Sequence, residues 1–251
     1  MNITATIITL NEAENIKDVI LSAKEVCNEI IVIDSQSTDR TRELAEELGA
    51  KVIIQPYLGD GPQKAFGVQF ATNNWILSLD ADERLDSDAI NEIKKLNLQN
   101  TEYDGYSFAR KTFVGKKLIR QWYPDRVVRL YNHNKCIYST SGGHAKVQTK
   151  NAKNLNAHIL HYSYKNYEEV IQTSYKFIER GARLAHQDGK RASKIDPFLH
   201  GFGALFKSLV LKKGIFYGID EIHIAVISSF SAYMKYALML EMQENNSLNG
   251  K

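Results

Sequence analysis

The sequence lacks the cysteine pattern of a disulfide-rich secreted protein or of a zinc protein. Two cysteines occur in 251 residues, Cys27 and Cys136, and they lie far apart in no metal-ligand spacing. This excludes a disulfide framework and a cysteine-based metal centre. We therefore expect reduced thiols and a cytosolic protein.

The sequence also lacks a strong charge of either sign. Lysine and arginine number 32 and aspartate and glutamate number 29, which gives a net charge of +3. This balance is too mild to indicate nucleic-acid binding, and we expect none. It is compatible with an anionic substrate or an anionic membrane surface.

No targeting or membrane-spanning segment is predicted. Residues 1–7 contain no cationic stretch and the apolar run ends at Asn11, so we expect no signal peptide. Residues 222–240 are apolar enough to raise the question of a transmembrane helix. His223 and Lys235 lie inside this segment and argue against it. We expect a cytoplasmic protein.

The sequence does contain a core-forming composition and an alternating pattern. Apolar residues make up 43% and charged residues 24%, which is ordinary for a soluble globular protein. Apolar runs and helical spacings alternate over the first hundred residues. The predicted strands are 3–9, 29–34, 51–54 and 75–80, and the predicted helices are 12–26, 40–48, 62–72 and 86–96. This order predicts an α/β fold with a doubly wound, mostly parallel sheet.

After about residue 103 the pattern changes. Short β-like segments separated by Asn, Gly and Lys turns extend to residue 162, and apolar residues at helical spacing follow from residue 166. We therefore predict an α/β domain over 1–165, a C-terminal helical extension over 166–242 and a disordered polar tail over 243–251.

Polar side chains follow the ends of the predicted strands. The ligands of a doubly wound sheet bind beyond the carboxyl ends of its strands, so these side chains are candidates for one binding site. Each also has a structural alternative as a helix cap. The residues are Thr9, Asn11 and Glu12 after the first strand, Asp34 at the second, and Asp80 with Asp82 at the fourth.

The Asp80-Ala81-Asp82 triplet predicts a metal site. Two aspartates at a strand end can present carboxylate oxygens to Mg²⁺ or Mn²⁺, which take their other ligands from water and substrate phosphates. The Gly-Asp-Gly-Pro-Gln-Lys turn at 59–64 adds Lys64 as a potential phosphate donor. The alternative for Lys64 is a solvated loop lysine.

Four segments resemble family 2 glycosyltransferases of the GT-A fold. They are Thr-Leu-Asn-Glu at 9–12, Val-Ile-Asp-Ser-Gln-Ser-Thr-Asp-Arg-Thr at 32–41, Gly-Pro-Gln-Lys at 61–64 and Trp-Ile-Leu-Ser-Leu-Asp-Ala-Asp-Glu at 75–83. Later segments, among them Trp-Tyr-Pro-Asp at 122–125 and His-Tyr-Ser-Tyr at 161–164, resemble the branch that contains bacterial glucosyltransferases of the lipopolysaccharide inner core. The resemblance extends to about residue 242.

The resemblance implies a UDP-sugar donor, a divalent metal ion (Mg²⁺ or Mn²⁺) and a nucleotide-sugar-binding and catalytic role for residues 1–165. Thr9 and Glu12 would border the nucleobase, with Asn11 beside them, and Asp34 would lie near uracil or ribose. Lys64 would lie near the diphosphate, Asp80 near the ribose or the metal, and Asp82 would be the direct metal ligand. The reaction would invert C1: an acceptor hydroxyl, deprotonated by a carboxylate, attacks as the nucleoside diphosphate leaves.

The sequence departs from this branch at one position. Where the branch commonly has His-Glu, this chain has His144-Ala145, and the alanine methyl group cannot accept a proton. Three hypotheses remain open. Asp125 is the base; His144 is the base or contacts the metal or phosphate; or the protein is slow or inactive.

The C-terminal third suggests attachment to a membrane. Apolar residues recur at helical spacing from Phe198 to Val210, with Lys207, Lys212 and Lys213 nearby, as in interfacial helices. The alternative is a core or dimer helix. Because the resemblance implies a lipid-linked acceptor, we expect a peripheral protein on the inner face of the cytoplasmic membrane.

The expected function is transfer of a hexose, most simply glucose from UDP-glucose, to a heptose of the lipopolysaccharide inner core or a similar lipid-linked acceptor. One alternative is a family 2 transferase acting on a capsular or exopolysaccharide carrier or on a peptide. A second is a nucleotide-sugar-binding protein without turnover, suggested by Ala145. A third is a nucleotidyltransferase, but the glycine-rich signature expected near its N-terminus is absent.

Overall fold

The computed structural model describes residues 2–139 and 145–249, and the chain forms two compact units. The first unit contains residues 1–111 and 124–162, and the second contains 112–123 and 163–251. The predicted division after residue 165 lies close to the return at residue 162. The prediction did not separate residues 112–123 from the first domain.

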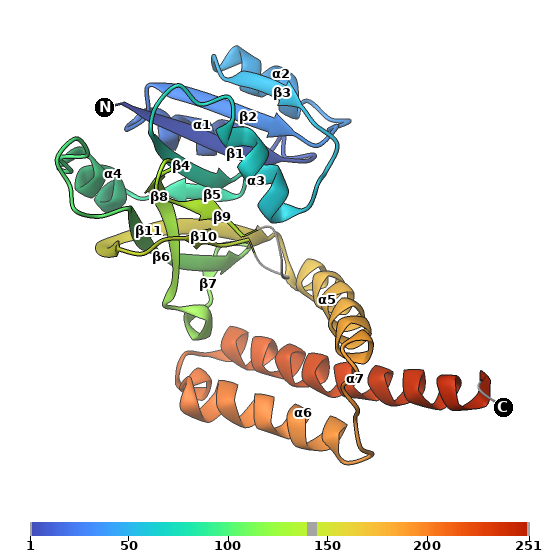
Figure 1. Ribbon diagram of the computed structural model, residues 1–251. Coiled ribbons are helices and arrows are strands. Elements are labelled where there is room, and N and C mark those ends of the chain that lie inside the picture. The colour runs from blue at the N-terminus through green and yellow to red at the C-terminus, as the bar shows by residue number, and fades with distance from the viewer. Residues whose placement is uncertain (1, 140–144, 250–251) are drawn as a thin grey trace. The chain divides into compact units, whose positions relative to one another are not determined.

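Strands and helices alternate in the first part of the chain (Figure 1). They are β1 (Ile3–Thr9), α1 (Ile16–Lys24), β2 (Glu29–Asp34), α2 (Thr41–Glu47), β3 (Lys51–Ile54), α3 (Asp60–Val68), β4 (Trp75–Asp80), β5 (Glu83–Leu85) and α4 (Ser87–Lys94). Strands then dominate, as β6 (Gly105–Val114), β7 (Lys117–Leu118), β8 (Asp125–Asn132), β9 (Ile137–Tyr138), β10 (Val147–Gln148) and β11 (Ala152–Tyr164).

The main sheet has a parallel part and an antiparallel part. Its order is β3-β2-β1-β4-β8-β6-β11-β5, with β7 paired to β6. The strands β3, β2, β1 and β4 are parallel, whereas β8 is antiparallel to both β4 and β6. The predicted α/β fold with a parallel central sheet is therefore confirmed.

The register brings three strand ends to one edge. Thr9 of β1 pairs with Asp34 of β2, and Ile8 pairs with Asp80 of β4. The chain leaves β1 towards β2 and β3 and then returns to the other side of β1 with β4. Such a reversal of strand order is where doubly wound sheets bind their ligands.

Helices cover both faces of the parallel strands. On one face, alternate residues of β1, such as Ile3 and Ile7, pack in one core with α1. On the other, Gly67 of α3 lies so close to the sheet that an added Cβ would be 3.0 Å from Cγ1 of Ile33. The missing side chain lets α3 approach β2, and this approach carries Lys64 to the strand ends.

Three helices dominate the second unit. They are α5 (Tyr167–Gln187), α6 (Asp196–Phe206), which continues as a π-helical turn over Lys207–Leu211, and α7 (Ile219–Asn249). Helix α7 packs against both α5 and α6 (Figure 1). None of the described helices is both long enough and apolar enough to cross a membrane.

The end of α7 corrects one prediction. Residues 243–249 are helical, not the disordered tail that the polar composition predicts. The side chain of Gln243 accepts a hydrogen bond from the Ala192 backbone N–H at 2.6 Å and donates one to its carbonyl at 3.0 Å. These contacts with a segment 51 residues away anchor Gln243, and a local composition does not reveal them.

Candidate functional site

Asp80, at the end of β4, lies between two cations. Lys64 Nζ is 2.6 Å from its Oδ1 and Arg129 Nη2, from β8, is 2.7 Å from its Oδ2. Partial burial raises the pKa of the Asp80 carboxyl, but Lys64 and Arg129 outweigh this effect and hold its pKa well below the usual range. Asp80 is therefore ionised, and both of its oxygens are engaged.

A second carboxylate, that of Glu83, shares the Arg129 guanidinium with Asp80. Glu83 of β5 is fully buried and accepts hydrogen bonds from Arg129 Nη2 at 2.6 Å, from Arg110 Nη1 at 3.3 Å and from the Asp80 backbone N–H at 3.2 Å. Arg110 Nε also donates to Asp125 Oδ2 at 2.9 Å. Charges buried this deeply are stable only when they are paired. The resulting network alternates in sign along Lys64, Asp80, Arg129, Glu83, Arg110 and Asp125.

Asp82 has a histidine partner. Its Oδ2 lies 3.3 Å from Nε2 of His161 in β11, with about a quarter of the Asp82 side chain exposed. Two ligands bound at about 2.1 Å and at a right angle to one small divalent ion are ~3 Å apart. The separation of these atoms therefore fits a shared divalent ion such as Mg²⁺ or Mn²⁺, for which the carboxylate is the preferred kind of ligand. The sequence prediction had paired Asp82 with Asp80 as the metal ligands.

Another group of potential ligands has a structural explanation. Among the described residues, Asp86, Asp88 and His158 form the one set of three whose ligand atoms lie within 4.8 Å of one another. Asp86 Oδ1 accepts from the Ala89 N–H at 2.8 Å and so caps α4. Its Oδ2 lies 3.1 Å from His158 Nδ1. A helix cap with a histidine neighbour accounts for this group.

Hydrogen bonds connect the loop after β1 to the loop after β2. Asn11 has a left-handed backbone, with φ of 55°, and its Oδ1 accepts from the Thr38 N–H at 2.8 Å. Asp34 is fully buried and accepts from the Ser37 N–H at 2.8 Å. Asn11 and Asp34 therefore shape the loops that border the edge.

Thr9 and Glu12 complete the edge at β1. In the part of the chain that the structure describes, the buried Oγ1 of Thr9 has no hydrogen-bond partner, so it has bonding capacity left for a ligand. Glu12 Oε2 accepts from Asn15 Nδ2 at 2.7 Å.

The predicted residues are thus partly brought together. Lys64 and Asp80 are in contact, and Asp125 joins them through Arg110. His144 lies outside the described residues. The half-buried Ala145 packs against the cluster that contains Tyr131 and Tyr138.

The sequence interpretation assigned no role to Glu83, Arg110, Arg129 or His161. One feature of the sequence could have identified Arg129. Arg129 stands in the apolar run Val127-Val128-Arg129-Leu130 of a strand, and a charge in such a run needs a buried partner.

Comparisons with known proteins agree with this architecture. The family model described as "Glycosyl transferase family 2" matches residues 4–211. An uncharacterized glycosyltransferase of Rickettsia bellii is 29% identical over 259 residues, which cover 96% of this chain and 86% of the relative. The lipopolysaccharide core biosynthesis glycosyltransferase LpsC of Rhizobium meliloti is 32% identical over 117 residues, 45% of this chain and 43% of the relative.

Among solved structures, TarS of S. aureus is similar with a TM-score of 0.50 at 13% identity, over 86% of this chain and 45% of that chain. At this identity the likeness is one of fold alone. The family match and this likeness confirm the predicted GT-A fold.

The buried Glu83 yields a stability prediction. Glu83→Gln removes the charge that Arg129 and Arg110 share, and we expect the free energy of unfolding to fall by about 3 kcal/mol, as when a buried ion pair loses one partner. The matched control is Glu92→Gln, because Glu92 forms an exposed pair with Lys95 at 3.0 Å, and its effect should stay within about 0.5 kcal/mol. Urea unfolding measures both. Equal effects of the two substitutions would contradict the network.

Proposed function

The chain belongs to glycosyltransferase family 2, and from this premise we propose that it transfers a hexose, with inversion at C1, from a UDP-sugar to a lipid-linked saccharide. The observation that carries the proposal is the Asp82–His161 pair beside the ion-paired Asp80, at the sheet edge where the strand order reverses. The donor would bind there, with Thr9 and the loop shaped by Asn11 and Asp34 around the nucleoside and Lys64 near the diphosphate.

Asp82 and His161 would hold the divalent ion. When bound, Mg²⁺ or Mn²⁺ supplies positive charge that neutralises the leaving diphosphate. The chain's own cations do this poorly, because Lys64, Arg129 and Arg110 are each paired with a carboxylate. Asp82 adds a further negative charge at the same edge.

Asp125 is the proposed base. Arg110 contacts its Oδ2 through both Nε and Nη2. Within residues 2–139 and 145–249 no hydrogen bond to Asp125 Oδ1 is found, and 43% of the side chain is exposed. The arginine would orient the carboxylate while its other oxygen accepts the proton of the acceptor hydroxyl.

The proposed donor and acceptor are UDP-glucose and a heptose of the lipopolysaccharide inner core. Support comes from the sequence motifs and from the likeness to LpsC over 45% of this chain. Ala145 favours one alternative, a nucleotide-sugar-binding protein without turnover. Release of UDP from UDP-glucose, Mn²⁺ and truncated lipopolysaccharide tests the proposal. UDP-glucose binding without UDP release on any acceptor would support the alternative.

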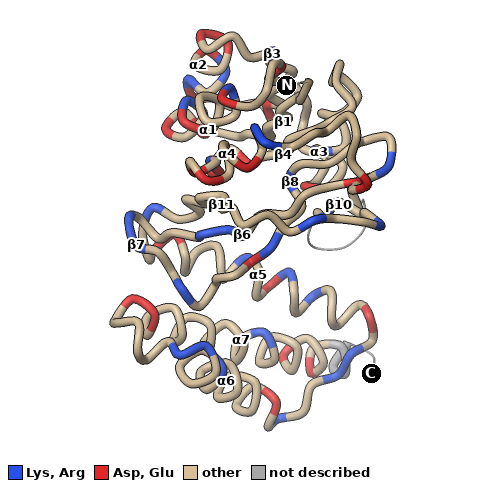
Figure 2. Tube along the Cα trace, turned by 90° about the vertical axis from the view of Figure 1, so that its left-hand side faces the viewer, with Lys and Arg blue, Asp and Glu red and all other residues tan. Residues whose placement is uncertain are grey.

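The second unit is the proposed membrane-attachment region, at the inner face of the cytoplasmic membrane. Phe198, Leu199 and Phe202 of α6 and Phe216 beyond it are between 60% and 80% exposed. No aspartate or glutamate occurs between residues 197 and 219, and lysines follow α6 at 207, 212 and 213 (Figure 2). Exposed aromatic residues edged by lysines suit an anionic lipid surface.

The metal role of Asp82 predicts a selective loss of activity. Asp82→Asn should lower Mn²⁺-dependent UDP release by about 10²-fold or more while leaving thermal unfolding unchanged, because an amide is a weak ligand for the ion that stabilises the leaving group. The matched control is Asp88→Asn, which should keep wild-type activity. Loss of activity in the control alone would contradict the role of Asp82 and would assign the metal to Asp86, Asp88 and His158.

The base role of Asp125 predicts a loss of chemistry rather than of binding. Asp125→Asn should lower kcat by ~10²–10⁴-fold and leave the Kd of UDP, measured by calorimetry, unchanged. As a control for the ion pair, Arg110→Lys should retain more activity than Asp125→Asn, since the carboxylate remains. Near-normal kcat in Asp125→Asn would exclude this base.

The attachment surface predicts lipid binding. The double variant Phe202→Ser/Phe216→Ser should bind vesicles of phosphatidylcholine and phosphatidylglycerol at least ~10-fold more weakly in sedimentation assays, since burying each ring contributes about 1.5–3 kcal/mol. The control Ile137→Ser changes a residue of the first unit that is 66% exposed, and it should bind like wild type. Equal vesicle binding by all three proteins would contradict the surface.

A further inference from the structure

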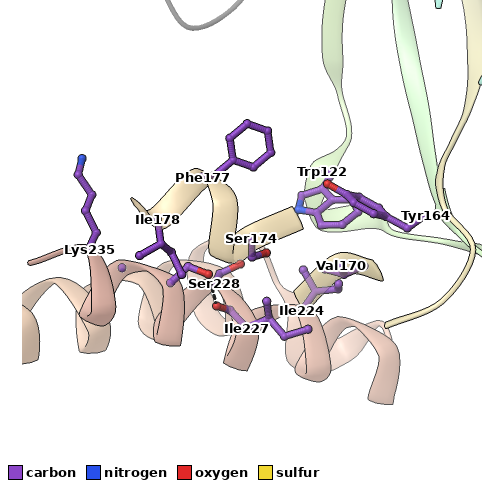
Figure 3. Close-up of a pocket in the computed structure, with 12 residues that line it drawn as sticks. Trp122, Tyr164, Val170, Ser174, Phe177, Ile178, Ile224, Ile227, Ser228 and Lys235 are labelled. Carbon is purple, nitrogen blue, oxygen red and sulfur yellow. Dashed lines mark hydrogen bonds between the residues drawn. The ribbon is translucent and has the colours of Figure 1, made fainter. Parts of the chain in front are cut away.

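A cleft in the second unit lies between α5 and α7. Figure 3 shows the rings of Trp122 and Tyr164 at one end and the Lys235 side chain at the other. Val170 and Ile178 of α5 and Ile224 of α7 line the space between, which has a volume of about 390 Å³. Its α7 wall runs from Ile224 to Lys235, about 16 Å along the helix axis. The cleft is therefore elongated, and its volume lies at the lower end of the ~300–1,000 Å³ typical of ligand sites.

The lining is apolar except at the Lys235 end and at a few serine hydroxyls. Residues 222–240 of α7 contain no aspartate, glutamate or arginine, and Lys235 is their one lysine. In the described part of the chain Lys235 has no ion-pair partner; its ammonium lies 5.8 Å from the centre of the Tyr236 ring. A half-buried lysine without a carboxylate partner can donate hydrogen bonds to an anionic ligand.

Lys235 also has room to reach the cleft. A Cβ added at Gly181 of α5 would lie 3.6 Å from Lys235 Cε, so the lysine stem runs directly over this glycine. The cation is thus held against α5, at the end of an apolar channel. An apolar channel that ends in a cation matches a ligand with a hydrocarbon chain and an anionic group.

We propose that this cleft binds one hydrocarbon chain of a lipid that carries a phosphate, with the phosphate at Lys235. The volume of about 390 Å³ matches a single hydrocarbon chain. The inference rests on the proposed function, in which the acceptor is lipid-linked, and it gives the lipid part of such a molecule a site apart from the exposed surface of α6.

The test uses the fluorescence of Trp122, which lines the cleft. The other tryptophan, Trp75, is buried in the first unit. A bromine-labelled dodecyl phosphate, used as a monomer below its critical micelle concentration, should quench Trp122 in the full-length protein. Trp122→Phe should abolish the quenching. Absence of quenching in the wild type would overturn the proposal.

Variants of the cleft distinguish binding of the phosphate group from binding of the hydrocarbon chain. Lys235→Gln should weaken binding of the alkyl phosphate about ten-fold and leave binding of a bromine-labelled dodecyl maltoside unchanged, and Lys235→Arg should restore the phosphate preference. Ala232→Leu places a larger side chain in the cleft and should weaken the binding of both probes. Equal phosphate binding by Lys235→Gln and wild type would overturn the head-group assignment.

One variant separates the cleft from the proposed membrane surface. Phe202→Ser/Phe216→Ser should be quenched like wild type, and loss of quenching in it would place the probe on α6 and overturn the cleft. The quenching experiment contains no sugar donor, so its result does not depend on sugar transfer. A protein that transfers sugar in the separate assay but shows no quenching contradicts this inference alone. Quenching without sugar transfer on any acceptor contradicts the proposed reaction alone.

Discussion

The ion pairs of Asp80 connect the two parts of the main sheet. Asp80 ends a parallel strand, Lys64 comes from the helix that crosses to it, and Arg129 comes from the first antiparallel strand. Glu83 then ties Arg129 to Arg110 on the next strand. Because burying any of these charges alone is costly, the strands can pack in this register only if the network closes. The carboxyl edge of the sheet is therefore built around fixed charges.

The same network sets the electrostatic character of the edge. Each of its cations already has a carboxylate, and Asp82 adds a negative charge beside His161. Without a further cation, this edge offers a diphosphate little net attraction. A divalent ion at Asp82 and His161 would reverse the sign of the local charge, which is the physical reason to expect donor binding and metal binding to be coupled.

The local pattern of the sequence predicts the parallel strands well. The bounds of β1, β2, β3 and β4 are as predicted, because buried parallel strands are continuous apolar runs between polar turns. Helix ends are displaced by a few residues, since α1 begins at Ile16 rather than at Glu12. Lys64 and Asp80, two candidates chosen because a motif and a strand end coincide, are in contact in the structure.

Other features depend on long-range contacts. The partners of Asp80 and Asp82 come from β8 and β11, 49 and 79 positions along the chain, and the register between these strands has no local signal. Gln243, near the end of α7, likewise forms its hydrogen bonds with the distant Ala192. The base assigned to Asp125 stays a prediction, and His144 lies outside the described residues.

Calorimetric titration of UDP into the full-length protein, with Mn²⁺ and then with the metal chelated, tests the coupling of donor and metal most directly. The account predicts a saturable heat with Mn²⁺ and no measurable binding without it, and the same loss in Asp82→Asn and His161→Asn with Mn²⁺ present. UDP binding of equal affinity with and without the metal would contradict it.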